Sequence, residues 1–440
     1  MAVTMIKYQF VFVSLVLLLS PDLSRAIEPI TSTWPQWGGP NRNFVVDTTG
    51  LAEHWPQTGP RRIWERELGE GYNTIACDDD ALYTMYRKAD EPDREYTIAL
   101  DRRTGATLWE SGHTAPILQF TKEFPGPNAS PLIVGERLFT FGLRGVLTCF
   151  QKKEGIVVWE KYLAEICNAP VPVGGFSASP IAFENLVIIP IGCAMPGQFM
   201  PPTEDGRPHQ YAEPSGQSLL ALDQSSGEIV WKSLDFHVGH TSPLLIRFDG
   251  RDMLIMHTCT GVTAVNPLDG SLLWHYPFPQ QHTDYVIASP VWNGEDTLFC
   301  TTGETGLALN LSKDGTQYHV KELWRGLKAA MSMGTPVFVD DQLIGSRGGG
   351  TSFLLSLDLR TGDRLWYNRA ISRSTVIAAD GKLILLSENG VLTLATATRE
   401  GVSFLSQYQL LERYSFTAPT LVGTTLYVRD TRKIMALDLR

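Results

Sequence analysis

The sequence lacks several features that define common chemical classes of protein. It has no two adjacent cysteines, no run of basic residues and no long apolar stretch after its first twenty residues. The Gly-x-Ser-x-Gly motif of many hydrolases, the His-Glu-x-x-His motif of zinc proteases and the phosphate-binding P-loop are also missing. The formal net charge is −10 at pH 7. Because an acidic chain without a basic patch binds anions poorly, we expect no nucleic-acid partner.

The first 26 residues have the pattern of a secretory signal peptide. Lys7 supplies the positive start, residues 10–19 form an apolar run, and the small residues Ser24 and Ala26 suit cleavage after Ala26. The apolar run is too short for a comfortable membrane span, although an uncleaved anchor is the alternative interpretation. We therefore expect export to a periplasmic or extracellular compartment, without a transmembrane segment. No cysteine lies near the cleavage site, so we expect no lipid anchor.

The six cysteines do not have the spacing of a disulfide framework. Four lie within or at the end of apolar, strand-like runs, where cysteine behaves as a small buried hydrophobic residue: Cys77, Cys149, Cys259 and Cys300. Cys167 and Cys193 flank a strand in loop-like sequence, and they are the pair best placed for a disulfide bond.

One motif recurs along the chain: an apolar run, Asp or a substitute, a short turn ending in Gly, three further residues and Trp. The copy Ile98-Ala99-Leu100-Asp101 with Gly105 and Trp109 shows the full pattern. In such a turn Asp can accept hydrogen bonds from nearby backbone amides, and Gly can adopt a positive φ. The other repeats place Trp159, Trp231, Trp274, Trp324 and Trp366 at the same position, and a degenerate copy has Leu405 there.

A second signature precedes each copy: a small residue followed by Pro at the start of an apolar strand. Pro is tolerated at the first residue of a strand because no ladder hydrogen bond is lost there. The signature occurs at Ser130-Pro131, Ser179-Pro180, Ser242-Pro243, Ser289-Pro290, Thr335-Pro336 and Ala418-Pro419, and Thr74-Ile75 and Thr375-Val376 replace it without Pro.

The spacing of the repeat predicts the fold. Successive Trp residues from Trp109 to Trp366 lie 50, 72, 43, 50 and 42 residues apart. This period is typical of one four-stranded antiparallel blade per repeat, with the inner strand after Ser-Pro and Trp on the outer strand. A large ring at a fixed offset suits packing between adjacent blades, so we interpret these Trp residues as structural. The sequence therefore predicts an all-β fold, a single eight-bladed β-propeller over residues 60–440.

The two ends of the chain are expected to close the ring. The eighth unit starts at Ala418 and stops at its third strand, Ala436-Leu437-Asp438. Its outer strand is found far upstream, in Ile63-Trp64-Glu65, so Trp64 becomes a seventh docking residue. Pairing these ends leaves no free sheet edge between blades. Residues 27–59 then form a strap that precedes the propeller.

These copies resemble the tryptophan-docking motif of the quinoprotein propeller superfamily. Its members include the methanol and glucose dehydrogenases and the non-catalytic propeller lipoprotein of the outer-membrane assembly machinery. The similarity covers residues 60–440, and the lead-in from Trp34 to Arg42 resembles the start of exported pyrroloquinoline-quinone-repeat proteins. The resemblance implies the fold, but one propeller serves catalysis and plain binding alike.

The same resemblance argues against a cofactor. The alcohol-oxidising members hold pyrroloquinoline quinone (PQQ) between a Trp and a disulfide of adjacent cysteines, and they bind Ca²⁺ with Glu, Asn and Asp. This chain lacks the adjacent pair, and no residue matches the calcium ligands by motif. We therefore expect no cofactor and no metal, and we keep PQQ with Ca²⁺ as the alternative.

Candidate ligand-binding residues lie on one face of the expected propeller. The connections from an outer strand to the next inner strand share that face with the connections between second and third strands, and function gathers on such loops. Residues 190–217 form a Pro- and Gly-rich insertion in the third blade, interpreted as a solvated lid, and residues 87–95 are interpreted as a charged solvent loop. The insertion carries Glu204, Asp205, His209 and Tyr211, whereas His240, Lys328 and Arg373 precede inner strands at the rim of the central channel.

Three function hypotheses follow. The leading one is an exported, monomeric, non-catalytic binding or scaffold propeller that holds a protein, peptide or polymer partner on these loops. The second is a quinone-dependent oxidoreductase of the alcohol or sugar dehydrogenase type that uses PQQ and Ca²⁺. The third is a polysaccharide-binding or polysaccharide-active propeller with its site under the inserted loop.

Overall fold

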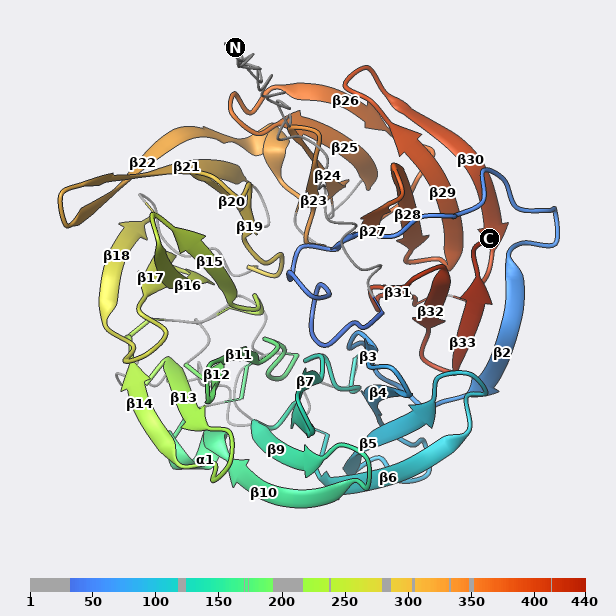
Figure 1. Ribbon diagram of the computed structural model, residues 1–440, viewed down its shortest axis with the longest axis horizontal. Coiled ribbons are helices and arrows are strands. Elements are labelled where there is room, and N and C mark those ends of the chain that lie inside the picture. The colour runs from blue at the N-terminus through green and yellow to red at the C-terminus, as the bar shows by residue number, and fades with distance from the viewer. Residues whose placement is uncertain are drawn as a thin grey trace, which may run out of the picture.

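The chain folds into a ring of eight sheets around a central axis (Figure 1). The computed structural model describes residues 32–117, 124–169, 171–172, 174–192, 217–236, 239–278, 286–302, 305–331, 334–347, 352–412 and 414–440. Each sheet has four antiparallel strands, and one of them gains a fifth, parallel strand from the N-terminal segment. The all-β, eight-bladed propeller expected from the repeat is therefore confirmed.

The blades follow one another in sequence order, and the strands of each blade run from the channel to the rim in the order named. Blade 1 contains β3 (Ala76–Cys77), β4 (Ala81–Tyr86), β5 (Arg94–Asp101) and β6 (Thr107–Thr114). Blade 2 contains β7 (Leu132–Val134), β8 (Arg137–Phe141), β9 (Val146–Gln151) and β10 (Ile156–Tyr162). Blade 3 contains β11 (Ile181–Phe183), β12 (Leu186–Pro190), β13 (Leu219–Asp223) and β14 (Ile229–Ser233). Blade 4 contains β15 (Leu244–Phe248), β16 (Arg251–Thr258), β17 (Gly261–Val265) and β18 (Leu272–Pro277).

The second half of the ring repeats this order. Blade 5 contains β19 (Val291–Trp292), β20 (Thr297–Thr301), β21 (Gly306–Asp314) and β22 (Gln317–Gly326). Blade 6 contains β23 (Val337–Val339), β24 (Gln342–Arg347), β25 (Phe353–Asp358) and β26 (Arg364–Asn368). Blade 7 contains β27 (Ser374–Ala379), β28 (Lys382–Ser387), β29 (Val391–Ala397) and β30 (Val402–Gln409), with β1 (Val45–Val46) added to β27. Blade 8 contains β31 (Thr420–Val422), β32 (Thr425–Arg429), β33 (Lys433–Asp438) and β2 (Arg61–Glu67).

The burial of each strand follows its place in the blade. Every residue of the second strands β4 and β28 is buried, because neighbouring blades cover both faces of these strands. The outer strand β22 alternates between exposed and partly buried residues, as expected for a strand with one face in water. Helical structure in the described residues is limited to two short turns, α1 (Leu163–Ile166) and η2 (Leu327–Ala329), neither long and apolar enough to cross a membrane.

The repeated Trp residues join adjacent blades. The indole N–H of Trp109 donates to the backbone carbonyl of Lys152 at 2.8 Å, and its ring lies against Gly155 in the same turn of the next blade. Gly155 has a φ of +69° and a Cβ there would collide with the indole, so both the conformation and the close contact require Gly. The same kind of N–H to carbonyl bond is made by Trp64, Trp159, Trp324 and Trp366.

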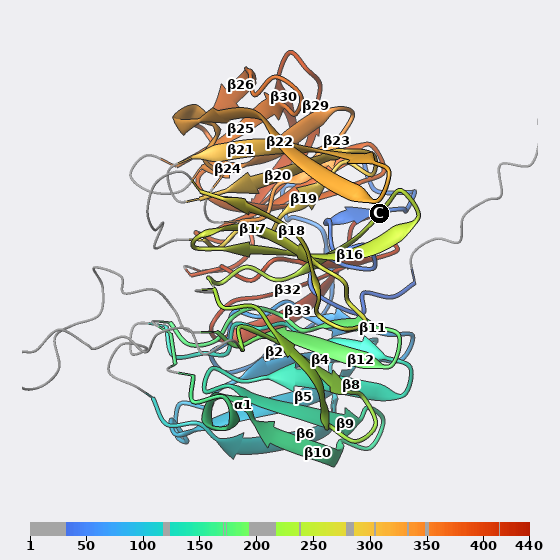
Figure 2. The same cartoon turned by 90° about the vertical axis from the view of Figure 1, so that its left-hand side faces the viewer.

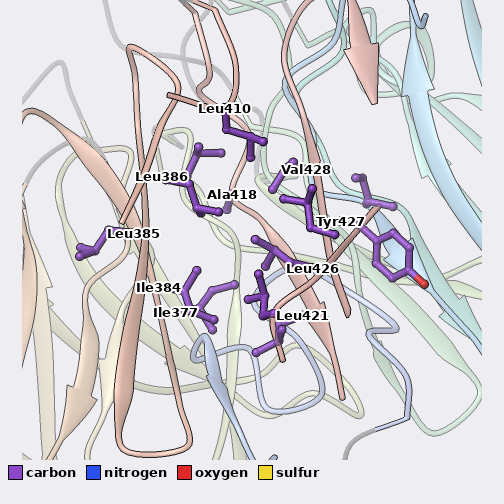
Figure 3. Packing of buried hydrophobic residues seen from close by; sticks show 14 of the residues in the cluster. Ile377, Ile384, Leu385, Leu386, Leu410, Ala418, Leu421, Leu426, Tyr427 and Val428 are labelled. Atoms are coloured by element: carbon purple, nitrogen blue, oxygen red, sulfur yellow. The ribbon is translucent and has the colours of Figure 1, made fainter. Parts of the chain in front are cut away.

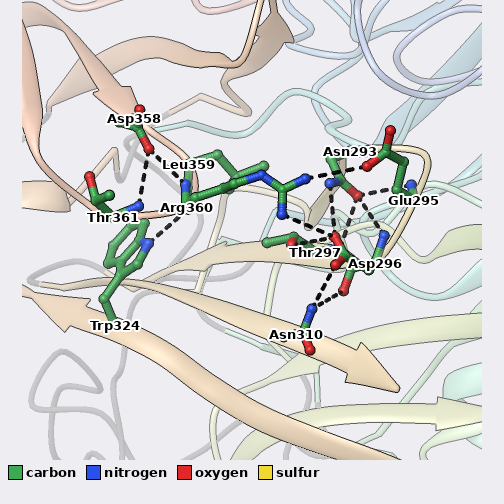
Figure 4. Close-up of polar contacts among 10 residues, drawn as sticks. All are labelled: Asn293, Glu295, Asp296, Thr297, Asn310, Trp324, Asp358, Leu359, Arg360 and Thr361. Carbon is green, nitrogen blue, oxygen red and sulfur yellow. Dashed lines mark hydrogen bonds and ion pairs between the residues drawn. The ribbon is translucent and has the colours of Figure 1, made fainter. Parts of the chain in front are cut away.

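The turn that receives Trp is built by the Asp of the motif. In blade 6, Asp358 accepts the backbone amides of Arg360 and Thr361 at 3.0 and 3.1 Å, and the following Leu359 carbonyl accepts the Trp324 indole N–H (Figure 4). Arg360 extends from the same turn to Glu295 of blade 5 at 3.3 Å. A single turn therefore fixes the backbone and holds two blades together, which gives the Asp-x-x-x-Gly spacing its physical basis.

The hydroxyl residue before Pro has a second role that the sequence signature did not reveal. The backbone N–H of Ser130 donates to the Ser179 hydroxyl of the next blade at 3.0 Å, and Ser179 donates in turn to Ser242 at 2.9 Å. The same bond links Thr74 to Ser130, Ser242 to Ser289, and Ser289 to Thr335. These residues therefore form a continuous belt of hydrogen bonds around the channel from blade 1 to blade 6. The hydroxyl, and not only the small size of the residue, explains why Ser or Thr recurs there.

The ring is closed by strands from the two ends of the sequence. β2 pairs antiparallel with β33, so that Trp64 lies opposite Ala436, and completes blade 8. Arg429 of blade 8 is fully buried and donates to the carbonyls of Met85 and Gly69 at 2.8 Å, which fastens this blade to the start of blade 1. The closure expected from the truncated eighth repeat is confirmed.

The segment before β2 crosses the middle of the ring (Figure 1). Trp34, fully buried, pairs through its backbone with Cys77 of β3 in blade 1, and β1 pairs with β27 in blade 7, on the other side of blade 8. Between these contacts Arg42 points to the inner strands of blades 3 and 4. It donates to the carbonyls of Pro243, Pro180 and Ser179 at 2.9, 3.1 and 3.4 Å.

A continuous apolar core runs between the blades on both sides of blade 8, where the ring closes. Between blades 7 and 8, Ile377 and Ile384 face Leu421 and Leu426, and Leu386 lies near Leu410 (Figure 3). All of these side chains are at most 6% exposed. Blade packing, rather than contacts within one sheet, therefore buries most of the apolar surface.

Candidate functional site

The connections between second and third strands, and those from an outer strand to the next inner strand, leave the blades on one side, which we call the loop face. Antiparallel pairing within each four-stranded blade puts both sets at the same end of the strands (Figure 2). The strap runs on the opposite side: the Leu51 amide donates to Asp380 in the first turn of blade 7, and the Arg102 side chain donates to the Ser32 carbonyl. The loop face is therefore the side not covered by the strap.

Four aromatic rings come together on the loop face where blades 7, 8 and 1 meet. We call Tyr72, Phe124, Tyr414 and Phe416 the aromatic cluster. Phe124 packs edge-on against Tyr72, Tyr414 and Phe416, with ring centroids 5.7–5.8 Å apart. Tyr414 is 38% exposed and the other three rings are partly buried, so the cluster presents apolar surface to solvent. Its members come from three different connections, and no motif in the sequence groups them.

Arg373 carries a positive charge to the edge of the aromatic cluster. Its guanidinium lies 5.4 Å from the centre of the Phe416 ring, close enough for a cation–π interaction. Its Nε donates to Glu388 at 3.0 Å, and a second nitrogen of the same guanidinium donates to the same carboxylate oxygen. Of the predicted rim residues His240, Lys328 and Arg373, it is Arg373 that lies beside the aromatic cluster. The same guanidinium therefore contacts both the Glu388 carboxylate and the Phe416 ring.

The cluster is held in place by buried polar residues beneath it. Tyr72 donates to Glu70, and burial together with this carboxylate raises the pKa of the Tyr72 phenol, which therefore stays neutral. The Tyr72 amide donates to the Pro127 carbonyl at 2.9 Å, and Asn73 donates to the same carbonyl. These bonds fix the chain that follows Phe124.

A buried ion pair supports the other side of the same segment. Arg87 donates to Glu95 at 2.9 Å, and both side chains are almost completely buried, at 4% and 0% exposed. Arg87 also donates to the carbonyls of Pro125 and Ala115, on either side of the Phe124 connection. The interpretation of residues 87–95 as a charged solvent loop is therefore wrong at its two ends. The sequence could not show this, because two carbonyls that also accept from Arg87, those of Ala115 and Pro125, lie 28 and 38 residues away.

Among the described residues, the other predicted site residues do not come together in one site. His240 is partly buried at the blade 3–4 connection, its Nδ1 lies 2.5 Å from the Ser177 hydroxyl, and loss of solvent around the ring lowers its pKa. Lys328 is exposed in η2, on the connection between blades 5 and 6. Glu204, Asp205, His209 and Tyr211 lie outside the described residues. His240, Lys328 and Arg373 therefore belong to three different connections.

The cysteines are placed in the interior. Cys77, Cys149 and Cys300 lie in strands, Cys259 directly follows β16, and all four are buried, as expected. Cys167 is a buried, unbridged thiol at the end of α1, whereas Cys193 lies outside the described residues.

A metal or a cofactor needs a group of side chains that come together to hold it. The whole sequence has no adjacent cysteines to stack on the quinone. In the part of the chain that the structure describes, no three His, Cys, Asp or Glu side chains come together as metal ligands would. The loop face instead places aromatic rings beside one guanidinium.

Eight four-stranded blades joined by docked Trp residues make this chain an eight-bladed β-propeller. Within that class, residues 93–366 match the family described as "Outer membrane protein assembly factor BamB", and the chain belongs to this family.

Individual relatives are distant in sequence. The chain is 22% identical over 310 residues to the outer membrane protein assembly factor BamB of Yersinia pestis, across 68% of this chain and 71% of that protein. The quinohemoprotein alcohol dehydrogenase of Comamonas testosteroni superposes with a TM-score of 0.65 at 12% identity, covering 94% of this chain and 82% of that one. The computationally designed protein Ika8 superposes with a TM-score of 0.57 at 10% identity, covering 86% and 99%. At such identities the likeness to solved structures shows the fold alone.

Proposed function

We propose that this chain is an exported, non-catalytic binding propeller that acts in outer-membrane protein assembly and holds a protein partner on its loop face. The observation that carries the proposal is the aromatic cluster with Arg373 at its edge, on a chain that belongs to the BamB family. Tyr, Phe and Arg side chains are the types that dominate the binding energy of protein interfaces.

The position of the cluster supports a protein partner. It stands beside the channel rim on the face opposite the strap, so an approaching chain meets no part of the N-terminal segment there. The rings are braced from below by Tyr72–Glu70 and by Arg87–Glu95, so little side-chain freedom is lost on binding.

Site-specific photo-crosslinking tests the proposal. A benzoylphenylalanine placed at Tyr414 samples the cluster, and the same residue placed at Phe404 is the matched control, because Phe404 is a similarly exposed aromatic, at 36%, on the outer strand β30. In cells that express the full chain, we expect position 414 to give an adduct with an outer-membrane assembly protein, identified by mass spectrometry. Arg373→Ala is expected to reduce this adduct several-fold.

Other outcomes would overturn the proposal. Equal adducts at both positions, or no protein adduct at position 414, would remove the loop face as a protein-binding surface. A tightly held chromophore and dye-linked alcohol oxidation after incubation of the purified protein with PQQ and Ca²⁺ would favour the oxidoreductase alternative. Binding on a glycan array would favour the polysaccharide alternative.

A further inference from the structure

A cavity of about 520 Å³ lies away from the loop-face site, between the outer strands of blades 7 and 8. This volume falls within the range of small-molecule sites, roughly 300–1,000 Å³. Its buried lining residues are apolar or aromatic, and its exposed lining residues include three arginines. The buried lining residues include Trp55, Leu410 and Leu437, and the exposed arginines are Arg61, Arg62 and Arg440.

Of the three arginines, Arg62 is paired with Glu65 at 2.7 Å, and the excess of positive charge comes from Arg61 and Arg440. Arg61 and Arg440 share one carboxylate, Asp438, with nitrogen–oxygen distances of 2.7 and 2.8 Å. These two guanidinium groups lower the pKa of Asp438, so that it is ionised, but one carboxylate cannot neutralise both of them. Each guanidinium has five N–H donors, and most of them are not used by Asp438. An anion entering the cavity would therefore meet unused, charged donors.

Trp55 supplies a second, independent indication of a ligand. Its side chain lines the cavity and is only 8% exposed, and its indole N–H has no hydrogen-bond acceptor among the described residues. A buried donor without an acceptor is costly. The indoles of Trp34, Trp37, Trp231 and Trp274 also lack an acceptor in the described part of the chain, so the unpaired donor of Trp55 counts here because this residue lines the cavity. The backbone N–H of Trp55 donates to the Ser406 hydroxyl at 2.8 Å, which holds this residue beside β30 of blade 7.

We propose that this cavity, which we call the seam pocket, binds a small amphiphilic anion: a phosphate or carboxylate group carried on an apolar body. Arg61 and Arg440 hold the charged group, because a planar guanidinium matches phosphate and carboxylate oxygens. Leu410, Leu437 and the Trp55 ring contact the apolar body, and the indole N–H donates to an oxygen of the ligand. The chain as a whole carries a net charge of −10, so anion binding at this position is local and not a property of the whole surface.

Calorimetric titration of the full chain with octyl phosphate below its micelle concentration tests the proposal. We expect saturable binding at one site, whereas octyl glucoside, which has the same apolar chain without the charge, does not bind. Arg61→Gln combined with Arg440→Gln keeps a hydrogen bond to Asp438 and removes both charges, and it should weaken binding at least about tenfold. Arg103→Gln, an exposed arginine in a turn of blade 1, is the matched control and should leave the affinity unchanged.

Two further measurements separate the sources of the ligand and guard against misfolding. Trp55→Phe removes only the indole N–H, and it should weaken binding while the melting temperature stays near that of the original chain. Sedimentation with vesicles of phosphatidylcholine containing phosphatidylglycerol distinguishes a lipid headgroup from a free amphiphile, and either result supports the pocket. The proposal is overturned if neither probe binds, if octyl glucoside binds equally well, or if only the control variant loses affinity.

Discussion

Two arginines lie in the interior of the ring and are held by carbonyl groups instead of carboxylates. Arg42 and Arg429 are each fully surrounded by protein, and burial lowers their pKa values to about 9 and about 10. Both therefore remain charged at neutral pH. Carbonyl oxygens at the ends of strands carry partial negative charge, and several of them around one guanidinium replace the water that it loses. Each arginine thus joins parts of the chain that are far apart in sequence.

Replacing Arg42 tests this role at the level of one side chain. In Arg42→Met the carbonyls of Ser179, Pro180 and Pro243 lose their donor while the strap covers them. We expect the free energy of unfolding to fall by about 2 kcal/mol or more, because unpaired buried acceptors are costly. Guanidinium denaturation followed by Trp fluorescence measures the change. Arg103→Met, on the surface, should stay within about 0.5 kcal/mol of the original chain, and equal effects of the two changes would contradict the assignment.

His257 makes stability depend on pH. This side chain, in β16, is 1% exposed, and burial lowers its pKa to about 4, below the value of about 6.5 for an unfolded chain. The fold therefore favours the neutral imidazole. Its contribution to stability is complete above pH 6.5 and is lost as the pH falls from 6.5 to 4, at up to about 1.4 kcal/mol per pH unit.

The variant His257→Leu removes the titrating group and keeps a buried side chain of similar size. Its melting temperature should fall less than that of the original chain between pH 6.5 and pH 4.5, as measured by scanning calorimetry. His319→Gln, an exposed position on β22, should leave the pH dependence unchanged. If His257→Leu and the original chain lose the same stability over this interval, the buried imidazole is not responsible.

At the scale of elements, the repeat determines most of what is observed. The position of Trp, the Asp-x-x-x-Gly turn and the strand after Ser-Pro follow from local rules of hydrogen bonding and periodicity, so the sequence predicted every blade and the pairing of β2 with β33. The belt of hydroxyl groups is different. Its bonds run between blades about 50 residues apart, as from Ser130 to Ser179, and local rules contain no information about them.

The candidate site escaped prediction for a similar reason. Phe124 and Phe416 are almost 300 residues apart in sequence, and only closure of the ring makes them neighbours. Nothing in either connection distinguishes these rings from the core aromatics of other blades. The position just before an inner strand selected Arg373, which lies beside the aromatic cluster, and it also selected Lys328, which is exposed on another connection. Position in the repeat indicates the face of the propeller, whereas the contacts depend on which blades become adjacent.

At the scale of the whole molecule, closure decides whether the ring ends in a free edge. Without β2, blade 8 would present the unpaired backbone of β33, a strand whose residues from Ile434 to Asp438 are all buried in the native ring. A buried apolar strand exposed at an edge is a template for pairing with another chain. Loss of β2 would also remove Trp64, whose indole N–H donates to the Arg102 carbonyl at 3.0 Å and so links blade 8 to blade 1.

Two truncations separate the strap from the closing strand. A chain that starts at Pro60 lacks the strap and keeps β2, whereas a chain that starts at Leu68 lacks both. We expect the shorter chain to melt at a clearly lower temperature than the longer one and to elute from a sizing column as larger species, because its β33 edge is free. A chain that starts at Ser32 keeps every described residue and serves as the reference. Should the two truncated chains melt and elute alike, pairing of β2 with β33 would not be what holds the ring closed, and the contacts of Arg429 with blade 1 would have to suffice.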